Sequence, residues 1–175
     1  MEAVSRFIFR TKKPEEQVRE WRQSIRAQER QLERQLRGIE AEEVKVKRSI
    51  KQAAKRGDMQ SSRQLARELV RSRQQKTRIH TSKAQLNSIN MQLQHQLAMV
   101  KMSGTLKQST DVMKAVNRLV RIPELSAQMQ QMSMEMLKAG VIGEMMDDTL
   151  DMMEDESLEE DAEEEVEKVL LEITQ

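Results

Sequence analysis

The chain has few of the residues that build a thick globular core. Its 175 residues contain two phenylalanines, one tryptophan and no tyrosine, although aromatic side chains usually supply much of the buried area of a core. Only five glycines and two prolines interrupt a chain in which 34% of the residues are charged. A composition rich in Glu, Lys, Arg, Gln, Ala and Leu with almost no helix breakers predicts an all-α fold of long helices or coiled coil.

The chain also lacks cysteine, which excludes disulfides and thiolate chemistry. No apolar run approaches the roughly 18 residues that a membrane-spanning helix needs, and the N-terminus has no apolar core of a secretory signal. We therefore expect a cytoplasmic protein whose contact with membranes is peripheral.

Residues that could carry catalysis are scarce. His80 and His95 stand alone, and the sequence shows no phosphate-binding Gly-rich loop, no nucleophile motif and no metal-ligand cluster. The carboxylates occur in runs, as they do on solvated faces. The sequence therefore predicts no enzyme, no cofactor and no metal site.

Charge is divided unevenly along the chain. Residues 1–121 carry 28 Lys and Arg against 12 Asp and Glu, whereas residues 122–175 carry 2 against 17. The formal net charge of +1 is therefore the sum of +16 and −15. Such asymmetry indicates a basic surface followed by an acidic end.

Two seven-residue apolar repeats predict a helical hairpin. The first covers 14–55, with Trp21, Leu36 and Ile50 beside the repeat Val18, Ile25, Leu32, Ile39, Val46 and Ala53. The second covers 59–121, through Leu65, Leu69, Ile79, Leu86, Ile89, Leu93, Leu97 and Val100. A short turn between two such helices makes them antiparallel. The pattern weakens near Gly104, so the second helix either continues to about Arg121 or breaks there.

The expected organisation has five segments. These are an amphipathic stretch at 1–13, the basic hairpin at 14–121, a short Met-rich helix with a hinge at 122–143, an acidic linker at 144–160 and an acidic amphipathic helix at 161–175. We expect four glycines to act as hinges: Gly57, Gly104, Gly140 and Gly143.

The N-terminal stretch and the first long helix are candidates for membrane contact. As a helix, the stretch places Met1, Val4, Phe7 and Ile8 on one face beside bases, an arrangement that suits a lipid headgroup layer; a frayed or packed tail is the alternative. Bases at 3- and 4-residue intervals then form a stripe along one side of 14–55. The basic candidates are Arg6, Arg10, Lys12, Lys13, Arg19, Arg22, Arg26, Arg30, Arg34, Arg37, Lys45, Arg48, Lys51 and Lys55. Anionic lipid and nucleic-acid phosphate would both suit such bases, but the lack of base-stacking aromatics favours lipid.

The Met-rich and acidic segments are candidates for contacts between subunits and for autoinhibition. Methionine suits surfaces that repack against several partners, and an ordinary helix core is the alternative for the same residues. The acidic helix has one apolar face that needs a docking site, and folding back would shield the basic stripe. The candidate residues are Met129, Met132, Met136, Val166, Val169, Leu170 and Ile173.

Five ordered segments together resemble the ESCRT-III family. They are REWRQSIRAQERQLERQLRGIEAEEVKVKRSIKQAAKRGD, SKAQLNSINMQLQ, GTLKQSTDVMKAVNRLVRIPEL, MLKAGVIGEMMDDTLDMMED and EEEVEKVLLEIT. The resemblance spans about residues 15–174. It implies a long hairpin, shorter helices, and a last helix that closes on its own hairpin or crosses a neighbour's.

The same resemblance implies a function. Members polymerise on membranes and remodel or sever narrow necks in multivesicular body formation, cytokinesis and budding, in the cytoplasm and peripherally on endosomal and other membranes. The implied partners are anionic lipids, copies of the chain and related subunits of the charged multivesicular body protein 2 type, without nucleic acid. The resemblance also implies an AAA ATPase that takes the polymer apart, although the family's tail helix that binds the MIT domain of this ATPase has no counterpart in these residues. A soluble coiled-coil scaffold whose basic face binds a protein or nucleic acid is the alternative, and a curved membrane-sensing dimer of the BAR kind is a third.

Overall fold

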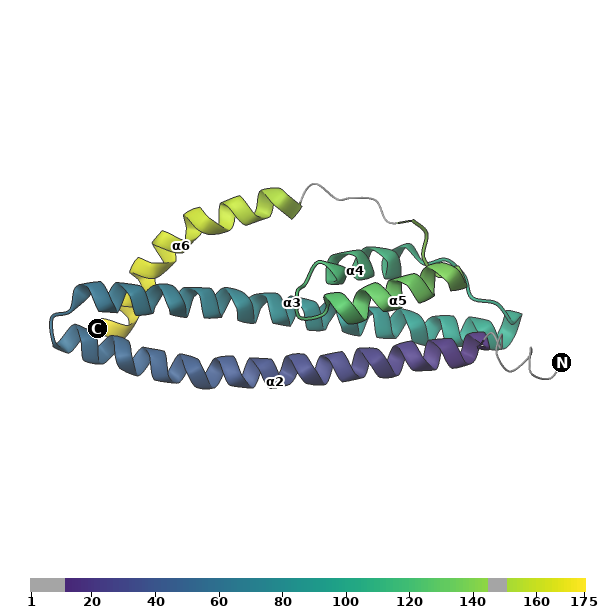
Figure 1. The fold of residues 1–175 in the computed structure, drawn as a ribbon, viewed down its shortest axis with the longest axis horizontal. Coiled ribbons are helices and arrows are strands. Elements are labelled where there is room, and N and C mark those ends of the chain that lie inside the picture. Colours follow the sequence, from purple (N-terminus) through teal and green to yellow (C-terminus); the bar gives the residue numbers. More distant parts are fainter. Residues whose placement is uncertain (1–11, 145–150) are drawn as a thin grey trace. The chain divides into compact units, whose positions relative to one another are not determined.

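A computed structural model describes residues 12–144 and 151–175, with side chains placed in 12–144 and 163–175. The regular structure of these residues is helical throughout: α2 (Pro14–Lys55), α3 (Met59–Ser103), α4 (Thr110–Val120), α5 (Ser126–Ala139) and α6 (Asp151–Thr174) (Figure 1). The all-α fold with a long hairpin of α2 and α3 is therefore confirmed. The bounds of α2 are those expected from the sequence.

Local chemistry fixes the turn between α2 and α3. Gly57 has a φ of 74°, a left-handed conformation that glycine adopts without steric cost. The Asp58 carboxylate then accepts hydrogen bonds from the Ser61 backbone N–H at 3.1 Å and the Ser61 hydroxyl at 2.7 Å. These bonds hold the pKa of Asp58 below its ordinary value of 3.8, because they favour the ionised form. The turn expected at Gly57 is thus present.

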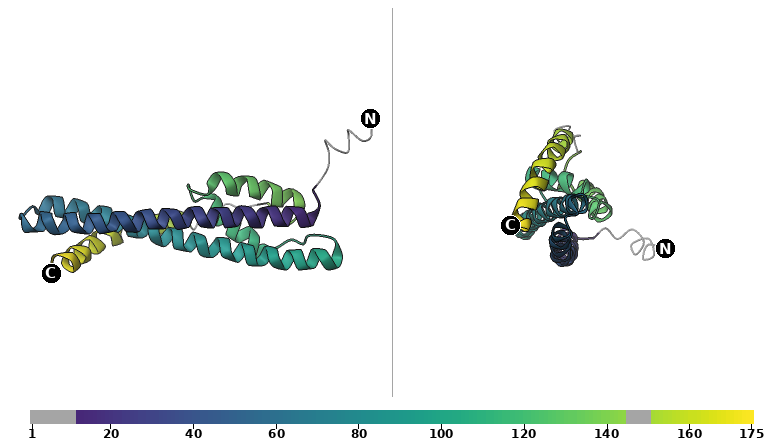
Figure 2. Two further views of the ribbon diagram at one scale, coloured as in Figure 1. Left: turned by 90° about the horizontal axis from the view of Figure 1, so that it is seen from below. Right: turned by 90° about the vertical axis from the view of Figure 1, so that its left-hand side faces the viewer.

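The chain divides into two compact units, each of which contains one section of the antiparallel pair α2 and α3. The first unit consists of Met1–Arg30 and Lys83–Met145, and the second of Gln31–Ser82 and Met146–Gln175. In the first unit, α4 and α5 pack on this section, and the view from below in Figure 2 shows α5 beside α2. In the second unit, α6 packs on the section next to the turn.

The first unit decides between the two possibilities left open near Gly104. Helix α3 ends at Ser103, and Gly104 follows with a φ of 76°. The helix therefore breaks, and α4 starts after a short extended connection, with the Ser109 side chain accepting from the Val112 N–H. The short Met-rich helix begins at Ser126 rather than near 122, because Ile122 to Leu125 forms a turn closed by a 3.0 Å backbone hydrogen bond. Pro123 occupies the second position of that turn, which suits its fixed φ.

The second unit corrects the bounds of the last helix. Helix α6 begins at Asp151, whereas the sequence was expected to remain a linker until residue 160. The stretch 151–160 has no glycine or proline and contains Met, Leu and Glu, which favour helix. Its many acidic residues suggested a linker, but their helix propensity is high enough to continue the helix.

Candidate functional site

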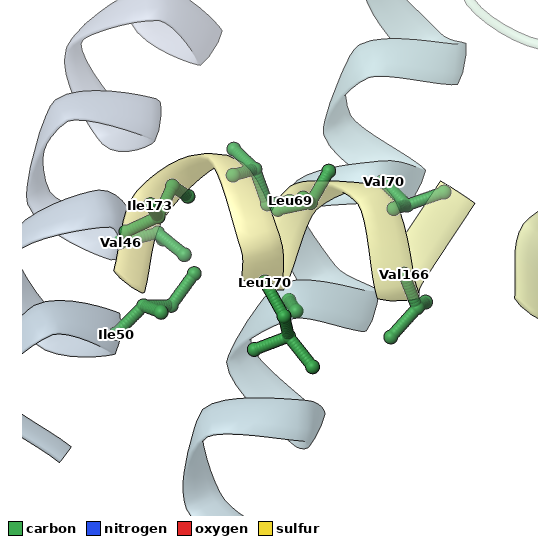
Figure 3. Packing of buried hydrophobic residues seen from close by; sticks show 9 residues of the cluster. Val46, Ile50, Leu69, Val70, Val166, Leu170 and Ile173 are labelled. Carbon is green, nitrogen blue, oxygen red and sulfur yellow. The ribbon is translucent and has the colours of Figure 1, made fainter. Parts of the chain in front are cut away.

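Helix α6 docks in the second unit through a small apolar cluster. Val166 and Val169 are each 1% exposed, and Leu170 and Ile173 are 6% and 8% exposed. Figure 3 shows Ile173 near Val46 and Ile50 of α2, and Val166 beside Val70 of α3. The four α6 residues repeat at intervals of 3, 1 and 3, so they form one face that packs on both long helices.

Ion pairs surround this cluster. Glu167 pairs with Arg63, Glu163 pairs with Arg67 at 3.7 Å, and Glu172 pairs with Arg73 at 3.6 Å. All three bases belong to α3. Attraction between the acidic end and the basic hairpin is therefore present, and its described contacts are on α3.

A buried carboxylate lies between α2 and α3 near the docking site. Glu43 is 8% exposed, and its carboxylate lies 3.6 Å from the Lys76 ammonium and 3.9 Å from the Arg73 guanidinium. Arg73 thus contacts carboxylates of both α2 and α6. This cluster was not expected from the sequence. The available signal was the position of Glu43, an acidic residue close to the first apolar repeat.

The free energies of the apolar contacts and of the ion pairs show which of the two holds α6 in place. Burying each of the four apolar side chains contributes about 1.5–3 kcal/mol. The three ion pairs of α6 are partly solvent-exposed, and such pairs contribute about 0–1 kcal/mol each. The apolar cluster therefore dominates the docking energy, and the charges mainly add orientation and a modest salt dependence.

The basic stripe lies on the exposed surface of α2. Exposed members are Arg19, Arg26, Arg30, Arg34, Arg37, Lys45, Arg48, Lys51 and Lys55. Those in the second unit stay exposed although α6 is docked there, so α6 does not shield the stripe as the sequence suggested. Arg22 is half-buried and its Nε donates to the Asn90 side-chain oxygen at 3.0 Å. Its guanidinium therefore fastens α2 to α3 in the first unit.

The structure describes only two of the other N-terminal candidates, Lys12 and Lys13. Met1, Val4, Arg6, Phe7, Ile8 and Arg10 lie outside the described residues. Lys12 and Lys13 are exposed, and the Lys12 ammonium donates to the Glu20 carboxylate at 2.7 Å. This hydrogen bond and the charge of Glu20 raise the pKa of Lys12 above its ordinary 10.5.

The Met-rich helix packs within the first unit. Met129, Met132 and Met136 are buried, whereas Met134 is 61% exposed. These three methionines therefore form an ordinary helix core here, which was the alternative to an exchangeable interface. Beside them, the Trp21 indole Nε1 on α2 donates to the Glu135 carboxylate at 2.9 Å. This polar link between α2 and α5 was not foreseen, since neither residue type nor spacing connects positions so far apart in sequence.

The glycines proposed as hinges have different surroundings. Gly140 caps α5 with a φ of 81°, and its N–H bonds to carbonyls of the last turn, an arrangement typical of a helix C-terminus. A side chain at Gly143 would approach the Gln108 side-chain nitrogen to 2.9 Å. Between them Val141 and Ile142 are buried, so this stretch is anchored to the first unit in the structure.

The connection between α3 and α4 is held by a buried amide. The Gln96 side chain, 6% exposed, donates to the Lys107 carbonyl at 2.8 Å and accepts from the Lys107 N–H at 3.0 Å. Further along, the Ser109 N–H donates to the Val141 carbonyl at 2.8 Å. These three bonds hold the connection after Gly104 against α3 on one side and against the end of α5 on the other.

Two kinds of feature, a metal-ion site and a membrane-spanning helix, are absent from the described residues. Within 12–144 and 151–175, no group of three or more His, Cys, Asp or Glu could hold a metal ion. No helix in this part of the chain combines the length and apolar character needed to span a bilayer. The arrangement consists instead of packing surfaces, a basic face and a docked acidic helix.

Comparison with known proteins identifies the family. A sequence profile of the Snf7 family matches residues 20–175. The chain belongs to the Snf7 family, that of the ESCRT-III subunits. Charged multivesicular body protein 3 of Homo sapiens is 48% identical over 164 residues, which are 93% of this chain and 74% of that protein. The Mus musculus protein of that name is 48% identical over 164 residues, 93% of this chain and 73% of the relative, and the Xenopus laevis protein is 45% identical over 162 residues, 92% and 74%.

These findings confirm the resemblance to the ESCRT-III family that the sequence shows. Proteins of the Snf7 family are structural rather than catalytic, so the chain is a non-enzymatic ESCRT-III subunit. Its family membership supports partners of its own kind, namely other copies and related ESCRT-III subunits.

Proposed function

We propose that the chain is a filament subunit that polymerises on anionic membranes with related subunits, and that the polymer remodels and severs membrane necks. The name of its relatives points to multivesicular bodies, so the proposed location is the cytoplasmic face of endosomal membranes, with cytokinesis and budding as further settings. The observation that carries the proposal is the exposed stripe of bases along α2.

Electrostatics supports a membrane as the surface that this stripe contacts. Each Lys or Arg near an anionic bilayer contributes about 1 kcal/mol, so several bases on one side of one helix suffice for peripheral binding. The attraction is screened within about 10 Å at 0.1 M salt. Binding should therefore require close approach and weaken as salt is added.

The proposal also assigns a role to the docking of α6, namely control of filament assembly. Because the stripe stays exposed while α6 is docked, the closed chain should already adsorb to anionic lipid. The apolar faces of α6 and of the hairpin are occupied by each other, and they are the surfaces that a neighbouring subunit would need. Release of α6 therefore controls assembly rather than adsorption, and its apolar face then packs on a neighbour's hairpin.

Vesicle flotation tests the adsorption step. The stripe variant Arg26→Gln/Arg30→Gln/Arg34→Gln removes three exposed charges, and at about 1 kcal/mol each it should bind anionic vesicles roughly 100-fold more weakly. Neutral vesicles should bind neither protein. Deletion of residues 1–10 should weaken binding further if Phe7 and Ile8 enter the lipid.

The matched control for the stripe variant replaces three uncharged exposed residues of α5, Gln128, Gln130 and Gln131, by alanine. It should float like the wild type. Equal binding of the stripe variant and the wild type to anionic vesicles would refute the role of the stripe. No binding of the wild type to these vesicles would refute the membrane function and favour a soluble scaffold.

A further inference from the structure

Helix α3 carries a second seven-residue pattern, on its exposed side. Ala84, Ser88, Met91, His95, Ala98 and Met102 follow one another at intervals of 4, 3, 4, 3 and 4 residues. All six are exposed, and Met91 and Met102 are 63% and 87% exposed. Alternating intervals of 3 and 4 place residues along one side of a helix, which is the spacing of a coiled-coil seam. We call these six residues the outer seam.

The outer seam is not needed for packing within the first unit, to which it belongs. There, the same helix uses Leu86, Ile89 and Leu93 to pack inward, and these are fully buried. The outer seam lies on the opposite side, so α3 has one occupied and one open seam in this unit.

Most of the outer seam lies in a stretch without charged residues, which Lys83 and Lys101 border. Residues 84–100 include no Asp, Glu, Lys or Arg, in a chain of which 34% is charged. Elsewhere in residues 1–121 the excess of bases opposes the approach of a second copy. Two copies can meet along residues 84–100 with like charges only at the two ends, where Lys83 and Lys101 lie. This low charge singles the stretch out as a surface for self-association.

The order of residues in the outer seam is also self-complementary. In an antiparallel pair related by a two-fold axis, Ala84 faces Met102, Ser88 faces Ala98, and Met91 faces His95, since the residue numbers of each pair add up to 186. The largest exposed side chain is thereby placed opposite a small one at each end. Such a surface, matched with itself, is what a two-fold interface requires.

We infer that the outer seam of α3 is a docking surface for the outer seam of a second copy, in an antiparallel pair. This inference rests on the proposed function, because a filament subunit needs surfaces that bind further copies. It specifies one such surface. The seam is about 27 Å long at 1.5 Å per residue, which is a small interface. It therefore belongs to the weak class and gains strength when copies are concentrated on one surface.

Charge variants in solution test the inference without a membrane. Ser88→Lys/Ala98→Lys places like charges opposite each other twice in the pair, and Ser88→Lys/Ala98→Glu places opposite charges there. Sedimentation equilibrium should show association at least about tenfold weaker for the Lys/Lys variant than for the Lys/Glu variant. Both substitutions are on exposed positions, so circular dichroism should show the same helix content. The control Gln130→Lys/Gln131→Lys adds the same charge on α5 and should associate more like the wild type than the Lys/Lys variant does.

Cysteine pairing tests the register, and the chain has no native cysteine to interfere. An equimolar mixture of Ser88→Cys and Ala98→Cys proteins should form the mixed disulfide dimer several-fold faster than either protein alone. Positions 88 and 88 of the two copies are ten residues apart along the pair, about 15 Å, which exceeds the span of a disulfide. The control mixture of Ala84→Cys and Ser88→Cys is further out of register and should not cross-link.

The two tests separate this inference from the proposed function. Equal association of the two charge variants, or no preference for the mixed disulfide, would overturn the inference even if the chain coats anionic vesicles. Specific pairing in solution together with no binding to anionic vesicles would support the inference and refute the membrane function.

Discussion

Replacing Leu170 of α6 by aspartate should release the helix from its docking site. Leu170 is 6% exposed within the apolar cluster of α2, α3 and α6. Truncating a buried leucine costs about 2–5 kcal/mol, and placing a carboxylate there adds the cost of burying a charge. The ion pairs around the cluster contribute too little to compensate, since exposed pairs are worth about 0–1 kcal/mol each.

Hydrogen exchange of residues 163–174 measures the release. Most of the stability of a helix in a protein comes from packing of its apolar face, so the amides of residues 163–174 exchange faster when α6 leaves the hairpin. A loss of at least 2 kcal/mol should raise the exchange rate about 30-fold or more. Raising the salt in the wild-type protein should change it less than this, because the apolar cluster is not screened.

The neighbouring residue provides the matched control. Leu171 is 58% exposed on the same helix, so Leu171→Asp introduces the same charge without entering the cluster. Its exchange should stay close to that of the wild type. Equal acceleration by Leu170→Asp and Leu171→Asp would show that general acidity of α6, rather than the cluster, controls docking, and would refute the reasoning.

Three further predictions concern polar contacts. Glu135→Ala leaves the buried Trp21 N–H without its acceptor, so the free energy of unfolding should fall by about 1–3 kcal/mol. The fluorescence of the single tryptophan reports the unfolding. Glu135→Gln should lower the free energy of unfolding less, because its side-chain carbonyl can accept the hydrogen bond. Gln96→Leu removes both bonds to Lys107, so exchange of the Lys107 amide should rise about tenfold; an unchanged rate would mean that the amide does not hold the connection. Asp58→Ala removes the carboxylate that caps α3, and the pKa of this carboxylate is lowered in the folded state. The Asp58 carboxylate therefore stabilises the fold above pH 3.8, and this stabilisation is lost as the pH falls through the lower folded pKa. The difference in Tm between wild type and Asp58→Ala should therefore shrink below pH 3.8, and a difference that grows there would contradict this sign.

Much of the fold could be read from the sequence because repeated spacing encodes helix faces. The seven-residue repeats placed α2 and α3, and the interval pattern of Val166, Val169, Leu170 and Ile173 identified the docking face of α6. The pattern could not show where that face docks, since its partners on α2 and α3 lie more than ninety residues earlier in the chain.

The parts that the sequence did not reveal depend on individual polar groups. Whether α3 breaks at Gly104 was left open, because a helical glycine costs only about 1 kcal/mol and the Gln96 amide supplies bonds of comparable size that favour the break. The link between Trp21 and Glu135 joins residues with no shared periodicity. The helical start of α6 was missed because acidic composition resembles a linker although its propensity is helical.

Negative-stain electron microscopy of Leu170→Asp on vesicles tests the central claim most directly. This variant, alone or with a related ESCRT-III subunit, should form filaments or coats on anionic vesicles and not on neutral ones. The wild type and Leu171→Asp should adsorb to the anionic vesicles with far fewer filaments. Bare anionic vesicles with the released variant, under conditions where hydrogen exchange shows α6 undocked, would contradict the claim that release of α6 permits assembly on membranes.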